Sequence, residues 1–142
     1  MNDPAAMADV LRSARTIAVV GLTDNRLRPA YHVAHYLIEA GYDIIPVGPS
    51  RKVHGVRAYA TLLDVPRPVD IVNIFRRSDR VGPHIDEAIA AHARCVWLQL
   101  RIRDQAAEQR AEQAGLIVVA DRCTQIEHAR LRAAGLLTSA VR

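Results

Sequence analysis

Several residue types are scarce in this chain, and each scarcity excludes a class of protein. Aromatic residues make up only 4% of the sequence and no basic run reaches five residues, although Lys and Arg outnumber Asp and Glu by 19 to 15. Proteins that bind single-stranded nucleic acid combine a basic groove with aromatic side chains on which bases stack, so this composition argues against a nucleic-acid partner. A net charge of +4 carried by scattered arginines instead favours a local cationic pocket for a phosphorylated small molecule.

The chain also lacks long hydrophobic runs, a cysteine framework and a metal-binding pattern. No apolar stretch approaches the roughly 20 residues that span a bilayer, and the first residues show no secretory signal pattern, so we expect a cytoplasmic protein without a membrane partner. Cys95 and Cys123 match no zinc spacing and require no oxidising compartment. His32, His35 and His128 form no metal pattern, and we interpret them as surface or pocket-edge residues.

What the chain does contain is an alternation of strand and helix patterns, over a length that suits one domain. Short runs rich in Val and Ile are too apolar for half-exposed antiparallel strands and predict buried parallel strands at 16–20, 43–47, 69–75, 94–98 and 116–120. Helical patterns lie at 4–14, 30–40, 80–93, 104–114 and 124–134, and glycines end three of them. Segment 49–68 is predicted to be mostly loop, with one short helical turn near 59–63. This alternation predicts an α/β fold, a doubly wound parallel sheet of about five strands flanked by helices, with ligands at the carboxyl ends of the strands.

The loop after the first predicted strand carries residue types that bind phosphate. Gly21 permits a tight turn and a close approach of the backbone to a pyrophosphate, and the next helix offers free N–H groups. The dinucleotide fingerprint Gly-x-Gly-x-x-Gly is absent, because Leu22 and Thr23 follow Gly21 and no further glycine comes in the loop. Thr23, Arg26 and Arg28 supply a hydroxyl and two guanidinium groups that suit phosphate. The alternative is that Gly21 serves only the strand-to-helix turn.

The end of the second predicted strand discriminates between nucleotides. An NAD site usually has an acidic residue there, which accepts a hydrogen bond from the ribose 2′-hydroxyl. In this chain the stretch reads Pro49-Ser50-Arg51-Lys52, which favours a ligand with a phosphate on its ribose, either NADP or coenzyme A (CoA). A solvated turn without a ligand is the alternative.

The ends of the third and fourth predicted strands add candidates to the same edge. Arg76, Arg77 and Ser78 follow the third strand, and Ser78 is also a candidate N-cap for the next helix. Gln99 ends the fourth strand and is a candidate for the pocket, whereas Trp97 is interpreted as a core residue. Three phosphate-binding loops are therefore expected to converge.

Cys123 stands where the fifth predicted strand gives way to the last helix. A thiol at a helix N-terminus can be reactive, but no histidine is placed by the sequence to act as its base. We therefore favour two other roles over that of a catalytic nucleophile. Cys123 is either a structural thiol or, in a regulatory protein, a thiol that forms a disulfide with the thiol of a cofactor.

Four segments together resemble the small stand-alone CoA-binding proteins. They read TIAVVGLTDNRLRPAYHVAHYLIEAGYDIIPVGP, VDIVNIFRRS, VWLQL and DRCTQIEHARL, in unbroken order over about 14–131. The domain of that family is similar to the N-terminal CoA-binding domain of the succinyl-CoA synthetase alpha subunit. The resemblance implies one domain over 1–142 with a Rossmann-like fold that holds CoA along the carboxyl edge of the sheet.

The resemblance also implies positions for the cofactor. Its phosphates are expected to meet the loop that begins with Gly21, Leu22 and Thr23. Its adenosine phosphate end is expected to be flanked by Val47, Gly48, Pro49, Ser50 and Lys52. The same groove is expected to be bordered by Phe75, Arg76 and Ser78, with Gln99 toward the pantetheine.

Two positions depart from the family pattern. Gly48 stands where the family usually has asparagine, so a side-chain hydrogen bond is missing. Arg101 stands where the family tends to have glycine, which puts a long cation where the backbone is expected to approach the ligand.

A family fold does not confer a reaction. We therefore favour a non-catalytic module that binds CoA or acyl-CoA. An NADP-dependent or other nucleotide-using enzyme is the alternative, although no placed general acid for a reductase is evident. The oligomeric state stays open, and an exposed edge strand is compatible with a homo-oligomer.

Overall fold

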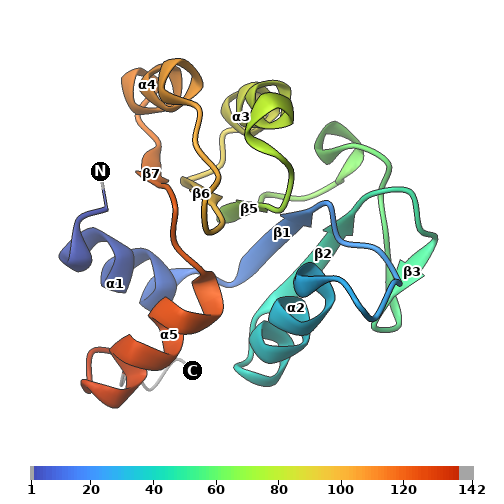
Figure 1. The fold of residues 1–142 in the computed structure, drawn as a ribbon, viewed down its shortest axis with the longest axis horizontal. Helices are drawn as coiled ribbons and strands as arrows, with labels where there is room; N and C mark the ends of the chain where they lie inside the picture. Colours follow the sequence, from blue (N-terminus) through green and yellow to red (C-terminus); the bar gives the residue numbers. More distant parts are fainter. Residues whose placement is uncertain (1, 138–142) are drawn as a thin grey trace.

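The computed structural model describes residues 2–137, and its centre is a five-stranded parallel sheet in the order β2-β1-β5-β6-β7. The strands are β1 (Thr16–Val20), β2 (Asp43–Val47), β5 (Ile71–Ile74), β6 (Cys95–Leu98) and β7 (Ile117–Val119). The helices are α1 (Pro4–Ser13), α2 (Pro29–Glu39), α3 (Val81–Ala90), α4 (Gln105–Gln113) and α5 (Thr124–Ala133). Helices α1, α2 and α5 cover one face of the sheet, and α3 and α4 cover the other (Figure 1). The predicted Rossmann-like α/β fold is confirmed.

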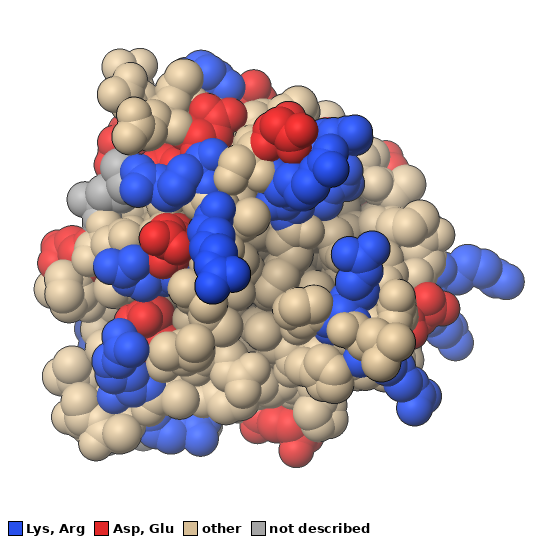
Figure 2. All heavy atoms as spheres, viewed as in Figure 1, with Lys and Arg blue, Asp and Glu red and all other residues tan. Residues whose placement is uncertain are grey.

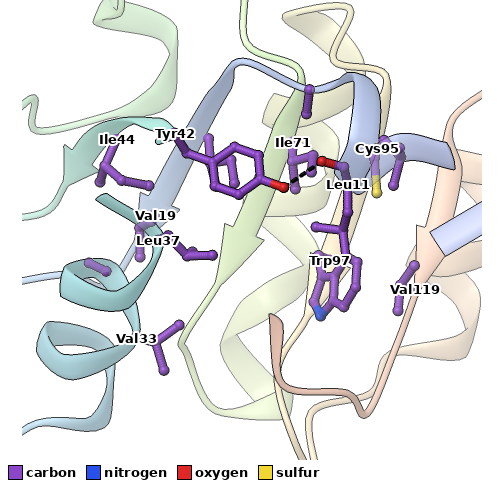
Figure 3. Packing of buried hydrophobic residues seen from close by; sticks show 14 of the residues in the cluster. Leu11, Val19, Val33, Leu37, Tyr42, Ile44, Ile71, Cys95, Trp97 and Val119 are labelled. Atoms are coloured by element: carbon purple, nitrogen blue, oxygen red, sulfur yellow. Dashed lines mark hydrogen bonds between the residues drawn. The ribbon is translucent and has the colours of Figure 1, made fainter. Parts of the chain in front are cut away.

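Both faces of the sheet are buried, because successive side chains along each strand enter different cores. Ile17 and Val19 pack with α1, α2 and α5, whereas Ala18 and Val20 pack with α3 and α4. Figure 3 shows the first core, where Trp97 from β6 packs beside aliphatic side chains of the strands and helices. Trp97 is fully buried and its Nε1 donates a hydrogen bond to the carbonyl of Arg122 (2.8 Å), so its predicted core role is confirmed.

The strand order determines where a ligand can bind. From β1 the chain crosses through α2 to β2 on one side, and it later returns to β5 on the other side of β1. The connections after β1 and β5 therefore leave on opposite faces of the sheet, which opens a crevice at the carboxyl ends of these two strands. The candidate loops after β1, β2 and β5 all lie at this edge.

Segment 49–68 contains a hairpin that the sequence did not predict. Strand β3 (Lys52–Val53) pairs antiparallel with β4 (Val56–Arg57). The turn residues His54 and Gly55 both have positive φ, 52° and 76°, as the tight turn of a two-residue hairpin requires. Strands of two residues are too short to show an alternating pattern. The predicted helical turn exists as a 3-10 helix at Leu62–Asp64, slightly later than expected.

The interpretation of His128 as a surface or pocket-edge residue is wrong. Its side chain is only 3% exposed, and its Nδ1 lies 2.9 Å from the hydroxyl oxygen of Tyr36. The ring of Tyr42 packs against the same imidazole edge to face. A buried histidine is tolerated here because a tyrosine hydroxyl pairs with its ring nitrogen.

The N-terminal segment protects the edge of the sheet next to β7. The Nδ2 of Asn2 donates to the carbonyl of Ala120 (2.7 Å), and the amide of Ala120 donates to the Oδ1 of Asn2 (2.8 Å). We expect Asn2→Ala to lower the free energy of unfolding by about 1–2 kcal/mol, because both backbone groups lose their partner. Urea denaturation measures this change.

Asp9→Ala is the matched control near the same terminus. Asp9 forms an ion pair with Arg12 on the exposed surface, so its replacement is expected to lower the free energy of unfolding by less than about 1 kcal/mol. Equal losses in the two variants would contradict the role assigned to Asn2.

Candidate functional site

A cavity of about 400 Å³ opens at the carboxyl edge of the sheet, between the N-termini of α2 and α5. Most of its wall is apolar. On the face of the molecule drawn in Figure 2, uncharged residues occupy the middle, and arginine, lysine and some acidic residues surround them. The lining residues are Gly21, Arg28, Pro29, Ala30, Val33, Phe75, Arg76, Arg77, Gln99, Leu100, Ile102 and Cys123. Of the fourteen predicted site residues, Gly21, Arg28, Phe75, Arg76 and Gln99 line this cavity.

Gly21 is fixed by the close approach of two strand ends. Its φ is +90°, and an added Cβ would lie 2.4 Å from the carbonyl oxygen of Phe75. Its amide donates to the carbonyl of Val47 (2.9 Å), so this one residue joins the ends of β1, β2 and β5. Leu22, by contrast, is fully buried in the core, and only its backbone could meet a ligand.

The loop from Leu22 to Arg28 is held by its own side chains. The hydroxyl of Thr23 accepts from the amide of Asn25 (3.2 Å), and the side-chain oxygen of Asn25 accepts from the amide of Leu27 (3.0 Å). Arg26 and Arg28 are exposed. Helix α2 then begins with Pro29, which has no N–H, and the helix has no side-chain cap. The amide of Tyr31 already donates to the carbonyl of Arg28 (3.1 Å), so the amide of Ala30 is available to an anion.

A second depression of about 840 Å³ is lined by Asp24, Arg51, Lys52, Arg57 and Ala58. Its three cations and one acid make it a basic site. The predicted phosphate-binding Lys52 lies here, on strand β3. Because the loop after β1 contributes Gly21 and Arg28 to the first cavity and Asp24 to the second, it borders both.

The loop after β2 supports the loop after β1. The hydroxyl of Ser50 accepts from the amide of Asp24 (3.1 Å) and donates to its Oδ1 (3.3 Å). An added Cβ on Gly48 would lie 2.8 Å from the carbonyl oxygen of Leu22, so the two loops are in close contact at the position where the family usually has asparagine. The side chain of Val47 is buried, whereas Pro49 is exposed.

Ser78 does not cap the following helix, and that prediction is wrong. Arg77 precedes the 3-10 helix Ser78–Arg80 without a side-chain cap. The hydroxyl of Ser78 instead accepts from the amide of Arg103 (3.0 Å) and lies 3.4 Å from the carbonyl of Arg101. Ser78 therefore fastens the loop after β6, whose residues Leu100 and Ile102 form part of the cavity wall.

Arg101 keeps the backbone conformation that glycine prefers. Its φ is +68°, in the left-handed region, and its amide donates to the Oδ1 of Asp121 (2.6 Å). The exposed Arg101 is not among the residues that line the cavity. The substitution thus leaves the turn intact and does not fill the cavity.

A buried polar network lies at one end of the cavity. Gln99 is 7% exposed, and its Oε1 accepts from the amide (3.1 Å) and the hydroxyl (3.3 Å) of Thr124. The Nδ2 of Asn73 donates to the same hydroxyl (2.9 Å). The sequence reasoning missed Asn73 and Thr124, although a single amide in the apolar run of β5 was a visible signal.

The arrangement suits an elongated ligand with an apolar arm and a phosphorylated end. Among the residues that line the first cavity there is no Asp, Glu or His, so that wall offers no side chain that commonly acts as a general base. Within residues 2–137 there is no group of three or more His, Cys, Asp or Glu that could hold a metal ion. The same residues contain no helix long and apolar enough to cross a membrane.

The family model for the CoA binding domain matches residues 15–129. The chain belongs to this CoA-binding domain family. The Bacillus subtilis protein YneT is 35% identical to this CoA-binding domain over 132 residues, which are 91% of this chain and 98% of YneT. A Thermus thermophilus protein of known structure is 40% identical with a TM-score of 0.86, over 91% of this chain and 98% of that chain.

The CoA-binding domain also shares its fold with part of a much larger enzyme. A dinucleotide-forming acetyl-coenzyme A synthetase of Ca. Korarchaeum cryptofilum is 22% identical with a TM-score of 0.68, over 78% of this chain and 26% of the synthetase. At that identity the likeness concerns the fold alone. The resemblance to stand-alone CoA-binding proteins is confirmed by the family match.

Proposed function

We propose that the chain binds CoA or an acyl-CoA and performs no chemistry on it. The observation that carries this proposal is the placement of an apolar cavity and a basic depression on either side of one loop. CoA has the same division, with an uncharged pantetheine arm at one end and an adenosine 3′-phosphate at the other. The family match supports the same ligand.

In this proposal the pyrophosphate lies against the loop that separates the two sites. Gly21 allows the backbone to approach it, and the amide of Ala30 at the uncapped N-terminus of α2 supplies an N–H donor. Thr23, Arg26 and Arg28 supply a hydroxyl and two charge-assisted donors from the same loop. The pantetheine arm then enters the apolar cavity, where the amide of Gln99 can bind one of its amide groups.

The adenosine phosphate lies in the basic depression. Arg51, Lys52 and Arg57 surround that space, and the Oδ1 and amide of Asp24 are held by Ser50. The loop from Val47 to Pro49 acts through its backbone, since it positions the loop after β1. A 2′-phosphate would suit the same cations, so NADP is the ligand to be tested against CoA.

A thermal-shift comparison of CoA, dephospho-CoA, NADP, NAD and ATP tests the proposal. A ligand at a hundred times its Kd stabilises the fold by about 2.7 kcal/mol, which for a domain of this size raises the Tm by on the order of 10 °C. We expect the largest shift with CoA and a smaller one with dephospho-CoA. A shift with NADP alone would favour a nucleotide-using enzyme, and no shift with any of the five would overturn the proposal.

Lys52→Ala is expected to lower the affinity for CoA about 10-fold to 100-fold, because one charge-assisted hydrogen bond to the ribose phosphate is lost. The same variant should bind dephospho-CoA almost as the unmodified chain does. Arg76→Ala is the matched comparison, since Arg76 lines the apolar cavity rather than the basic depression. Arg76→Ala should lower the affinities for CoA and dephospho-CoA by the same factor. Isothermal titration calorimetry measures all four affinities, and equal losses for both ligands in Lys52→Ala would place the ribose phosphate elsewhere.

A further inference from the structure

We propose that Cys123 is a site of reversible covalent modification by the disulfide form of CoA. The product is a mixed disulfide between the Sγ of Cys123 and the sulfur at the end of the pantetheine arm. The inference depends on the proposed function, because the arm must enter the apolar cavity to bring its sulfur to the wall that contains Cys123.

Cys123 has the placement that such a reaction requires. It is the N-cap residue of α5, it makes no disulfide within the described chain, and it lines the cavity at the end where the β6 loop closes it. It is 8% exposed, so bulk reagents have little access to it except through the cavity. The apolar side chains of Val33, Leu100 and Ile102 line the same wall and can pack against the methylene groups of an arm.

A second side chain in this wall indicates a ligand independently of the thiol. Gln99 is more than nine-tenths buried, and Thr124 binds its Oε1 from two directions. Its amide nitrogen has no hydrogen-bond partner among residues 2–137 and belongs to the wall of the cavity. Unlike the Oδ1 of Asn73, this nitrogen is not fully buried, so it can donate a hydrogen bond to a ligand that brings an acceptor into the cavity.

The amide carbonyls of pantetheine are acceptors of the required kind. Thr124, which fixes the amide of Gln99, is the residue directly after Cys123. A carbonyl bound by Gln99 therefore holds the arm beside the thiol. The Oδ1 of Asn73 in the same network is fully buried and also has no partner in the described residues, which marks this end of the cavity as unusually polar beneath its apolar wall.

The reaction is a thiol–disulfide exchange and needs no other oxidant. Cys123 loses its proton, and its sulfur attacks one sulfur of the CoA disulfide. The bond between Cys123 and that CoA sulfur forms while the original S–S bond breaks. The second CoA leaves as a thiolate and takes up a proton, so one disulfide is consumed and one is formed.

Cys95 provides an internal comparison. It lies in the middle of the sheet on β6 with no exposed surface, and burial raises the pKa of its thiol to about 12. A buried thiol of this kind stays protonated and unreactive in the native chain. Peptide mapping can therefore separate a site-directed reaction from general thiol chemistry.

The experiment treats the reduced protein with CoA disulfide and, separately, with glutathione disulfide, and follows intact mass and peptide maps. We expect one adduct, the mass of one CoA less two hydrogen atoms, on Cys123 alone. The rate of adduct formation should saturate as the concentration of CoA disulfide rises. It should exceed the rate with glutathione disulfide by about tenfold or more, because binding raises the local concentration of the CoA disulfide at Cys123. Excess reduced CoA should slow it, and dithiothreitol should reverse it.

Cys123→Ser and Cys123→Ala separate this inference from the proposed function. Both variants should lose the adduct, and the thermal shift with reduced CoA is measured on each variant as a separate readout of binding. A normal shift with reduced CoA in the unmodified chain, without an adduct on Cys123, would overturn the modification and leave the binding function standing. Equal, non-saturating rates with both disulfides, or an adduct on Cys95, would overturn it too. Absence of any shift with reduced CoA would overturn both.

Discussion

Gly21→Ala is expected to lower the free energy of unfolding by about 3–5 kcal/mol and the Tm by on the order of 10 °C. Two costs add at this residue. A side chain at φ +90° is strained by about 1–2 kcal/mol, and a Cβ placed 2.4 Å from the carbonyl oxygen of Phe75 forces the ends of β1 and β5 apart. Differential scanning calorimetry measures the loss.

Gly115→Ala carries the first cost without the second, so the difference between the two variants measures the contact with Phe75. Gly115 follows α4 with φ +92°, almost the same backbone conformation, but an added Cβ there meets no atom within 4 Å. Its replacement should cost only about 1–2 kcal/mol. Similar losses at both glycines would mean that backbone strain alone makes Gly21 necessary and that the contact with Phe75 contributes nothing.

The Gly21 substitution should also abolish most of the CoA-dependent thermal shift. The same contact that excludes a side chain brings the β1 loop against the edge of the apolar cavity. If Gly21→Ala lowers stability but leaves the affinity for CoA unchanged, the loop fulfils only a structural role at this point.

The sheet was predictable because its signals are local. Runs such as 16–20 and 43–47 are short, apolar and bounded by turn residues, and helices α2 and α4 end at glycines with positive φ, Gly41 and Gly115. Parallel strands that are buried on both faces give this pattern without tertiary information. The hairpin at Lys52–Arg57 lacks a local signal, since its strands are two residues long and His54 rather than Asn or Gly opens the turn.

The site was predictable only in part, because its walls come from segments that are distant in sequence. The loops after β1, β2 and β5 were assigned to one edge by topology alone, and Gly21, Arg28 and Arg76 do line the cavity there. Val33 and Ile102 enter the wall through the packing of α2 and the β6 loop, which no spacing in the sequence reveals. The sequence also placed the predicted cations at one groove, whereas Arg28 and Arg76 line the first cavity, Lys52 lines the second and Arg26 lines neither.

Glu108→Ala is expected to lower the free energy of unfolding by about 1.5–3 kcal/mol, since it removes a buried carboxylate that accepts charge-assisted hydrogen bonds from the half-exposed Arg103. Glu108 on α4 has no exposed surface. Its carboxylate accepts from the Nε (3.1 Å) and Nη2 (2.9 Å) of Arg103 and from the amide of Asp104 (2.8 Å). The hydrogen bond to Glu108 raises the pKa of Arg103, which therefore stays charged.

The effect should extend to the cavity, because Arg103 belongs to the loop after β6, which contributes Leu100 and Ile102 to the cavity wall. The amide of Arg103 donates to Ser78, and the amide of Ile102 donates to the carbonyl of Gln99 (3.0 Å). When Glu108 no longer holds this loop, the wall at Leu100 and Ile102 loosens and CoA should bind more weakly.

Glu112→Ala on the exposed side of the same helix is the matched control, with an expected change within about 0.5 kcal/mol. Glu108→Gln keeps the shape of the side chain and part of its hydrogen bonding. Its stability should therefore lie between those of Glu108→Ala and Glu112→Ala, and it should stay folded even if Glu108→Ala does not. Guanidinium denaturation ranks the three variants, and titration of CoA into those that fold reports on the cavity. Equal midpoints for Glu108→Ala and Glu112→Ala would show that the ion pair of Glu108 with Arg103 does not stabilise the fold. A destabilised Glu108→Gln with unchanged CoA affinity would show that the β6 loop is held independently of Glu108.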